Sequence, residues 1–229
     1  MESKVMKQEE IACKTHQSQA YFNRFLLNLY DFVVYRIVSK FIWRIPEARL
    51  IQHYKKHLNR NHLEVGVGTG YLLEKAKDNI KQLSLMDLSE PCLMKTAKRL
   101  KSFNPSVYRQ NILDKPRLDN KFDSISVNYV MHCVTGDFKQ KGIAFNHLKS
   151  LLNEDGVLFG TTVLRTPNSS FLAKFAMHVL NSIGLFNNRN DHIDELHASL
   201  QHYFKHVDIK TVSSVAIFLA SDKPLATEG

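Results

Sequence analysis

From about residue 61 onward, short apolar runs alternate with helical patterns, and this alternation most constrains the fold. Five runs are typical of buried strands: HLEVG, QLSLMDL, SVYRQ, FDSISVNY and GVLFGTTVL. Strands alternating with helices form right-handed βαβ units, so we expect an α/β fold with a doubly wound, mostly parallel sheet. Two later runs, 206–212 and 214–220, can pair as an antiparallel hairpin through Ser213 and Ser214, which makes seven strands.

The loop after the first strand reads LEVGVGTG, with Glu64 just before its three glycines. A dinucleotide-binding loop has the spacing G-x-G-x-x-G, whereas this loop reads G-x-G-x-G and has Tyr71 where the last glycine would stand. Glu64 would repel a pyrophosphate but attract an ammonium group. The loop therefore favours a ligand that carries an amino group.

A second acid, Asp87, ends the next strand, seventeen residues after Gly70. A carboxylate at this offset can accept hydrogen bonds from both hydroxyls of a ribose. Asp87 can also be only a cap for the helix that starts near Ser89. A ligand with an ammonium group, a carboxylate and a ribose satisfies all of these features, and S-adenosylmethionine is such a ligand.

Four motifs in order, LEVGVGTG, LMDLS, RQNILD and FDSISVNYVMHCV, resemble those of the class I S-adenosylmethionine-dependent methyltransferases. The resemblance spans roughly residues 61–165 and implies a Rossmann-like fold and S-adenosylmethionine as the cofactor. It also implies that Asn111 stands where the family usually has aspartate, and that Asn128 lies near the sulfonium. The cofactor-binding residues that it implies are Glu64, Gly66, Gly68, Gly70, Asp87, Leu88, Asn111, Ile112 and Asn128.

His132 follows the fourth strand and is the candidate catalytic residue. A histidine there can take a proton from an acceptor hydroxyl as the methyl group arrives, or it can merely line the first turn after the strand. Methyl transfer does not require a base, because the sulfonium is a strong electrophile and in-line displacement gains mostly from proximity and orientation.

From about residue 17 to 58 the apolar residues recur at helical spacing, with a break at Pro46. We expect residues 1–58 to form an N-terminal helical lid, residues 59–229 to form the methyltransferase domain, and residues 166–190 to add a helical lid insertion. Enclosure of this kind keeps water away from the reaction. The candidate substrate and lid residues are Tyr21, Tyr30, Trp43, Met131, Phe171 and Phe175.

Two acceptor classes follow from these features, a small molecule and RNA. The formal net charge is +9, and residues 1–60 carry eleven lysines and arginines against five acids, which could dock RNA. The fourth-strand motif NYVMHC lacks the Asn/Asp-Pro-Pro-aromatic signature of base-amino methyltransferases. We therefore expect a small-molecule acceptor, with RNA as the alternative and a non-catalytic cofactor-binding protein as a third hypothesis. The sequence leaves open whether oxygen, nitrogen or carbon accepts the methyl group.

The remaining features indicate a cytoplasmic monomer or homodimer. Three widely spaced cysteines, Cys13, Cys92 and Cys133, form no Cys-x-x-Cys motif, so we expect neither disulfides nor a zinc site. His192 and His197 are five residues apart, which places them on different helix faces, and we expect no metal. The apolar run FLLNLYDFVVYRIV contains Asn, Asp and Arg and is too short to span a membrane.

Overall fold

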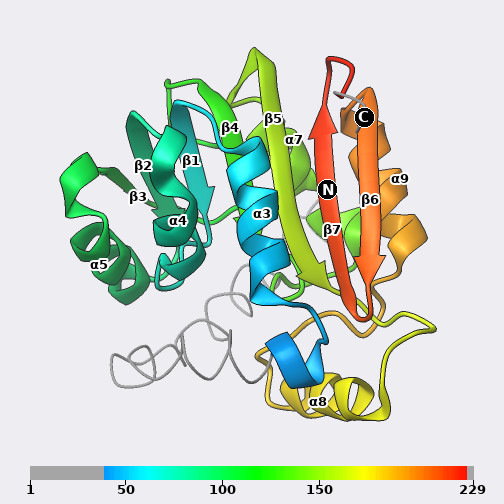
Figure 1. Cartoon of the computed structure of the whole chain (residues 1–229). Helices are drawn as coiled ribbons and strands as arrows, with labels where there is room; N and C mark the ends of the chain where they lie inside the picture. Colours follow the sequence, from blue (N-terminus) through cyan, green and yellow to red (C-terminus); the bar gives the residue numbers. More distant parts are fainter. Residues whose placement is uncertain (1–38, 226–229) are drawn as a thin grey trace, which may run out of the picture.

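The computed structural model describes residues 39–225 and contains one seven-stranded sheet, in the order β3-β2-β1-β4-β5-β7-β6 (Figure 1). Neighbouring strands from β3 to β5 are parallel, and β7 runs antiparallel to both β5 and β6. The strands are β1 (Asn61–Val65), β2 (Gln82–Asp87), β3 (Ser106–Arg109), β4 (Phe122–Asn128), β5 (Leu152–Val163), β6 (His206–Val212) and β7 (Val215–Ser221). The predicted mostly parallel sheet with a C-terminal antiparallel hairpin is confirmed.

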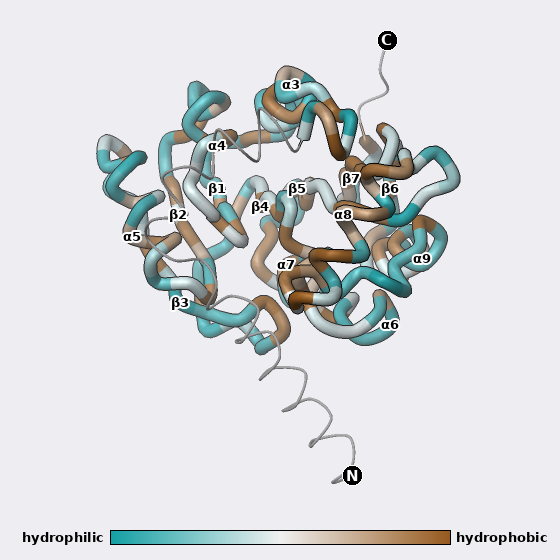
Figure 2. Tube along the Cα trace, turned by 90° about the horizontal axis from the view of Figure 1, so that it is seen from below, coloured by the Kyte–Doolittle hydropathy of each residue, from teal (hydrophilic) through white to brown (hydrophobic). Residues whose placement is uncertain are grey.

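Helices cover both faces of the sheet, as the view along the strands shows (Figure 2). One face carries α3 (Glu47–His57), α4 (Tyr71–Ala76) and α5 (Glu90–Arg99); the other carries α6 (Phe138–Lys141), α7 (Ile143–Lys149) and α9 (Ile193–Tyr203). Short 3₁₀ helices follow α4 and α5 at Lys77–Asn79 and Lys101–Phe103. The remaining helix, α8 (Phe171–Ser182), lies below the sheet at the carboxyl ends of the parallel strands (Figure 1).

The chain reverses its direction of travel across the sheet between β1 and β4. It proceeds from β1 outward to β2 and β3, and then returns to place β4 on the other side of β1. At such a switch point the loops after neighbouring strands diverge to opposite faces and leave a crevice at the carboxyl ends. The loops that follow β1, β2 and β4 therefore surround one place on the molecule, which is where the sequence predicts a ligand.

Helix α3 is part of the sheet domain, although the sequence places it within the lid segment 1–58. Pro46 precedes its first turn, and Leu50, Tyr54 and Leu58 are buried against the sheet. Burial of this apolar face stabilises the helix on the strands. The lid hypothesis for the front of the chain is thus confined to residues before Glu47.

Candidate active site

The glycine loop joins β1 to α4 and passes close to the end of β2. Gly66 has φ +67° and its N–H donates to Met86 O at 2.8 Å. A Cβ added to Gly66 would lie 2.1 Å from Val130 Cγ2, so this glycine lets the loop pack against the residues that follow β4. Gly68 has φ +49°, and an added Cβ there would meet no atom of residues 39–225 within 4 Å. The loop thus combines close packing at Gly66 with an open cradle at Gly68, which a ligand can fill.

Asp87 stands at the end of β2, beside the glycine loop. Its side chain is buried, and its Oδ1 accepts a hydrogen bond from the backbone N–H of Ser89 at 2.8 Å. Burial raises the pKa of Asp87 to about 6, although backbone N–H groups, that of Ser89 first, act in the opposite direction. The cap of α5 is a different residue, because Ser89 Oγ accepts from the Cys92 N–H. The desolvated carboxylate of Asp87 is therefore suited to receive donors such as ribose hydroxyls.

Asn128 ends β4 and holds an amide donor that lacks a partner. Its Oδ1 accepts from Thr161 Oγ1 at 3.1 Å, whereas its buried Nδ2 has no hydrogen-bond partner among residues 39–225. A buried donor without an acceptor costs about 1–3 kcal/mol, so its presence at the switch point indicates a ligand oxygen. The open cradle, the desolvated carboxylate and this orphaned donor fit S-adenosylmethionine, which carries a ribose and a carboxylate.

Glu64 lies in a buried hydrogen-bond network between β1, β4 and α3. Its Oε1 accepts from the Tyr54 hydroxyl at 2.7 Å, and its Oε2 accepts from the Ser126 hydroxyl and lies 3.3 Å from His62 Nε2. His62 Nδ1 in turn lies 2.8 Å from Ser124 Oγ. These partners hold the carboxylate in one orientation at the base of the glycine loop. The predicted contact between Glu64 and an ammonium group stays a prediction.

Tyr54, His62 and Ser126 were not predicted as site residues from the sequence. A signal for two of them exists, because polar residues alternate as His62 and Glu64 on β1 and as Ser124 and Ser126 on β4. In the parallel register His62 stands opposite Ser124, and Glu64 stands opposite Ser126. Alternating polar residues on two strands that are neighbours in space point to one buried network.

The predicted adenine-side residues lie after β2 and β3. Asn111 is buried, and its Oδ1 accepts from the Leu113 N–H at 3.0 Å, so its amide oxygen stabilises the turn. Ile112 packs in the core with Met86 and Val65, and Leu88 is half-buried directly after Asp87. The contacts of Leu88, Asn111 and Ile112 with adenine stay predictions.

His132 is buried in the loop after β4, next to the end of β5. Its Nδ1 accepts from the backbone N–H of Val163 at 3.3 Å and lies 3.4 Å from Thr162 Oγ1. The ring of Phe186 is 4.3 Å from the imidazole between centroids, and that of Tyr129 is 6.0 Å away. Burial first, and then the charge of Lys141, lower the pKa of His132 to about 3, so the ring is neutral at physiological pH.

Hydrogen bonds hold the segment that follows α8 against the loop that contains His132. The Asn187 N–H donates to His132 O at 2.7 Å, and Asn188 Nδ2 donates to Val163 O at 2.9 Å. Lys141 and Asp191 add a fully buried ion pair with an Nζ–Oδ2 distance of 2.5 Å. The ion-paired residues were not predicted from the sequence either, because they lie 50 positions apart and form no local motif.

The predicted substrate and lid residues occupy different environments. Trp43 is buried and stacks on Phe186 at 6.0 Å, which joins the front of the chain to the segment after α8. Phe171 and Phe175, both on α8, are 86% and 57% exposed within the described structure. Tyr21 and Tyr30 lie outside the described residues.

Met131, named above among the candidate substrate residues, lies in the core of the described structure. Its side chain is fully buried in the core on the α7 face of the sheet, with Phe138, Phe145 and Leu148 as members of the same cluster. Met131 therefore packs the core, as an apolar residue next to a buried strand commonly does.

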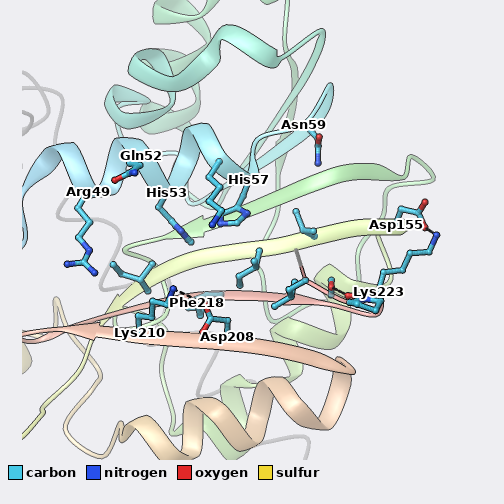
Figure 3. A pocket seen from close by; sticks show the side chains of 17 residues that line it. Arg49, Gln52, His53, His57, Asn59, Asp155, Asp208, Lys210, Phe218 and Lys223 are labelled. Atoms are coloured by element: carbon cyan, nitrogen blue, oxygen red, sulfur yellow. Dashed lines mark hydrogen bonds and ion pairs between the residues drawn. The ribbon is translucent and has the colours of Figure 1, made fainter. Parts of the chain in front are cut away.

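One large groove lies away from this site, between α3 and the face formed by β5, β7 and β6 (Figure 3). Its volume is about 710 Å³, and Arg49, His53, His57 and Lys210 are among its lining residues. Neither the glycine loop nor Asp87, Asn128 or His132 lines it. The groove is therefore distinct from the site at the switch point.

Within residues 39–225, no cluster of three or more His, Cys, Asp or Glu side chains could hold a metal ion. None of the helices in the same range is long and apolar enough to cross a membrane.

Comparisons with known proteins agree with the geometry. Residues 63–158 match the family model described as a methyltransferase domain. Demethylluteothin O-methyltransferase of Streptomyces thioluteus is 35% identical over 207 residues, covering 88% of this chain and 90% of that protein. Methyltransferase aurB of Calcarisporium arbuscula is 33% identical, covering 89% of this chain and 96% of that protein. The DhpI–SAH complex has a TM-score of 0.63 at 14% identity, covering 91% of this chain and 98% of that one.

The chain belongs to the class I S-adenosylmethionine-dependent methyltransferases. It is a methyltransferase whose cofactor is S-adenosylmethionine, as the sequence predicted.

Proposed function

We propose that this methyltransferase transfers the methyl group to an oxygen of a small, largely apolar acceptor. The observation that supports binding of the methyl donor is the conjunction, at one switch point, of the open cradle at Gly68, the desolvated Asp87 and the Asn128 amide donor without a partner in residues 39–225. The choice of oxygen is supported by the names of relatives, which include demethylluteothin O-methyltransferase and a physcion biosynthesis cluster O-methyltransferase of Aspergillus chevalieri.

Three residues of the chain would form the cofactor site. Asp87 would hold the ribose hydroxyls, Asn128 would donate to an oxygen of the methionyl part, and Gly68 would leave room for the ligand. When bound, the cofactor supplies a sulfonium methyl group that an acceptor can attack in line. Catalysis then comes mainly from proximity and orientation, which can account for several kcal/mol of the barrier. A general-base role for His132 stays a prediction.

Methyl transfer from labelled S-adenosylmethionine distinguishes the acceptor classes. We expect label in a small-metabolite extract, with little dependence on salt. If RNA is the acceptor, label in total cellular RNA should fall about tenfold to a thousandfold between low and physiological salt, since several phosphate contacts would be lost. Salt-sensitive label in RNA, with none in the metabolites, would overturn the proposal.

Replacing Asp87 by alanine is expected to weaken binding of S-adenosylmethionine about tenfold to a hundredfold, because charge-assisted hydrogen bonds worth about 1.5–3 kcal/mol are lost. Calorimetric titration measures the affinity. The control is D78A, which removes an exposed carboxylate after α4. Equal affinities of D87A and the wild type would remove Asp87 from the site.

The raised pKa of Asp87 predicts that cofactor affinity depends on pH. Ribose hydroxyls donate to the charged carboxylate, so binding favours the deprotonated form and lowers the pKa of Asp87. Affinity should therefore rise as the pH increases through about 6 and level off above it. Titrations between pH 5 and pH 8 check this, and in D87N, which lacks the titrating group, the rise should disappear.

We further propose that α8 and the chain before Glu47 form a lid over the acceptor. Phe171 and Phe175 are large apolar side chains that nothing in residues 39–225 covers, on a helix at the carboxyl ends of the strands. Trp43 and Phe186 bring the front of the chain to the same end of the molecule. An apolar acceptor bound beneath such a helix would be shielded from water.

The double variant F171S/F175S tests this lid. We expect its free energy of unfolding to change by less than about 1 kcal/mol, because both rings are exposed. With 1-naphthol as an apolar acceptor, kcat/KM should fall about tenfold or more, since contacts of aromatic rings with the acceptor are lost. The control is M94S on α5, where a methionine is 64% exposed. Equal kinetics of the two variants would exclude the α8 face from the acceptor site.

A further inference from the structure

The hydrogen bond at His132 Nδ1 determines which nitrogen of the ring carries the proton. The backbone N–H of Val163 can only donate, so Nδ1 must be the unprotonated, accepting nitrogen. A neutral imidazole holds one proton, which then resides on Nε2. Thr162 Oγ1, 3.4 Å from Nδ1, can donate to the same lone-pair side. The surroundings of the ring therefore select the Nε2–H tautomer.

The loop around His132 makes this orientation hard to change. The ring is buried between Phe186 and Tyr129, and its backbone oxygen is held by the Asn187 N–H. To accept a proton at Nε2, the neutral ring would need the other tautomer, which directs an Nδ1–H against the Val163 N–H. Two donors facing each other in a buried place lose a hydrogen bond and leave both unsatisfied.

The groups beside His132 offer no alternative base. Burial raises the pKa of the Tyr129 hydroxyl above its usual range, and it raises the pKa of the neighbouring Cys133 thiol to about 12. Both groups keep their protons at neutral pH. Lys141 is the charged group that acts on the ring, and it is held by Asp191. Neither Tyr129 nor Cys133 is therefore ready to accept a proton from an acceptor hydroxyl.

We propose that His132 serves the reaction as a hydrogen-bond donor through Nε2–H, and that the acceptor is an acidic hydroxyl, a phenol or an enol, which is already deprotonated when the methyl group is transferred. This inference rests on the proposed oxygen transfer and names its substrate class. The acceptor gives its proton to solvent before reaction, and its oxygen then forms the new O–C bond. The C–S bond breaks, sulfur keeps the electron pair, and the products are a neutral ether and a neutral thioether. An Nε2–H donor can orient the oxyanion without taking a proton from it.

The tautomer can be measured without turnover. Long-range ¹H–¹⁵N correlation spectra of the full chain should show His132 with a pyrrole-type Nε2 and a pyridine-type Nδ1, unchanged between pH 6 and pH 8. The signals are assigned by their loss in H132Q, and H202Q, at an exposed histidine of α9, serves as the control. A pyridine-type Nε2 would overturn the proposal, whatever the activity of the protein.

Kinetics with substituted protein separate a donor from a base. Glutamine can donate a hydrogen bond but cannot act as a base, and leucine can do neither. We expect H132L to lose about tenfold to a hundredfold in kcat/KM, the range for a hydrogen bond to a charged group, and H132Q to lose less than about tenfold. Equal losses in the two variants, with S-adenosylhomocysteine affinity and thermal unfolding unchanged, would contradict the donor role.

Three aromatic probes of similar size test the acceptor class: 4-nitrophenol, phenol and benzyl alcohol, in order of decreasing acidity. Methyl transfer should be readily detected with 4-nitrophenol, be weaker with phenol at neutral pH and be absent with benzyl alcohol. Comparable rates with benzyl alcohol would overturn the inference while leaving oxygen transfer intact. If no hydroxyl compound is methylated but an amine is, the proposed oxygen transfer fails, and the spectrum alone then decides the tautomer.

Discussion

Replacing Asp191 by alanine is expected to lower the free energy of unfolding by about 3–5 kcal/mol, because it leaves a buried lysine without its counter-charge. Both side chains of the Lys141–Asp191 pair are almost fully buried, at 0% and 1% exposure. Burial opposes the charged form of each group, raising the pKa of Asp191 to about 6 and lowering that of Lys141, while each partner's charge acts in the opposite direction. Chemical denaturation of the wild type and D191A measures the difference.

A matched pair on the surface provides the control. Lys223 and Asp155 also form an ion pair, but their side chains are 61% and 69% exposed. An exposed pair contributes about 0–1 kcal/mol, so D155A should be close to the wild type. The double variant K141M/D191L replaces both buried charges with apolar groups and should regain most of the stability that D191A loses. Similar losses in D191A and D155A would show that burial does not decide the effect.

The buried Lys141–Asp191 pair also affects the site of the reaction, because it holds the segment after α8 beside His132. Lys141 Nζ lies 3.4 Å from both Val134 O and Asn187 O, and Asn187 holds the backbone oxygen of His132. The pair thus links the end of the proposed lid to the loop after β4. It acts on the chemistry only through these contacts, since its own atoms are enclosed by protein.

Features that depend on spacing within one segment could be predicted from the sequence. The strand and helix order follows from hydrophobic periodicity, and the glycine loop and Asp87 lie at the ends of consecutive strands, where the topology brings them together. Periodicity also located α8, but it could not tell which side chains of that helix would be exposed, and the role of Phe171 and Phe175 in binding the acceptor stays a prediction.

Features that depend on contacts between distant segments could not be predicted in this way. The partners of Glu64 come from α3 and β4, and their contact requires the strand register and the packing of α3 on the sheet. The core position of Met131 was not predicted, because the backbone turns directly after β4, where Tyr129 has φ +55° and the alternation of faces ends. The tautomer of His132 depends on Val163, thirty-one positions away on the next strand.

The same substitution at two neighbouring glycines is expected to destabilise the fold to different extents. G66A should lower the free energy of unfolding by about 2–5 kcal/mol, because alanine at φ +67° is strained and its Cβ would lie 2.1 Å from Val130 Cγ2. G68A should cost only about 1–2 kcal/mol, because the backbone strain is similar but no atom of the described residues lies within 4 Å of the added carbon. Denaturation curves of the two variants measure this difference.

Cofactor binding provides a second test of the loop, at Gly68. The methyl group of G68A would point into the open cradle, so we expect affinity for S-adenosylhomocysteine to fall at least about tenfold in a protein that is still folded. The double variant G66A/V130A lacks the Val130 methyl groups that would clash with the Cβ of alanine at position 66. It should therefore recover part of the stability that G66A loses. Calorimetry on folded G68A gives the decisive measurement: wild-type affinity there would mean that the ligand does not approach the loop at Gly68.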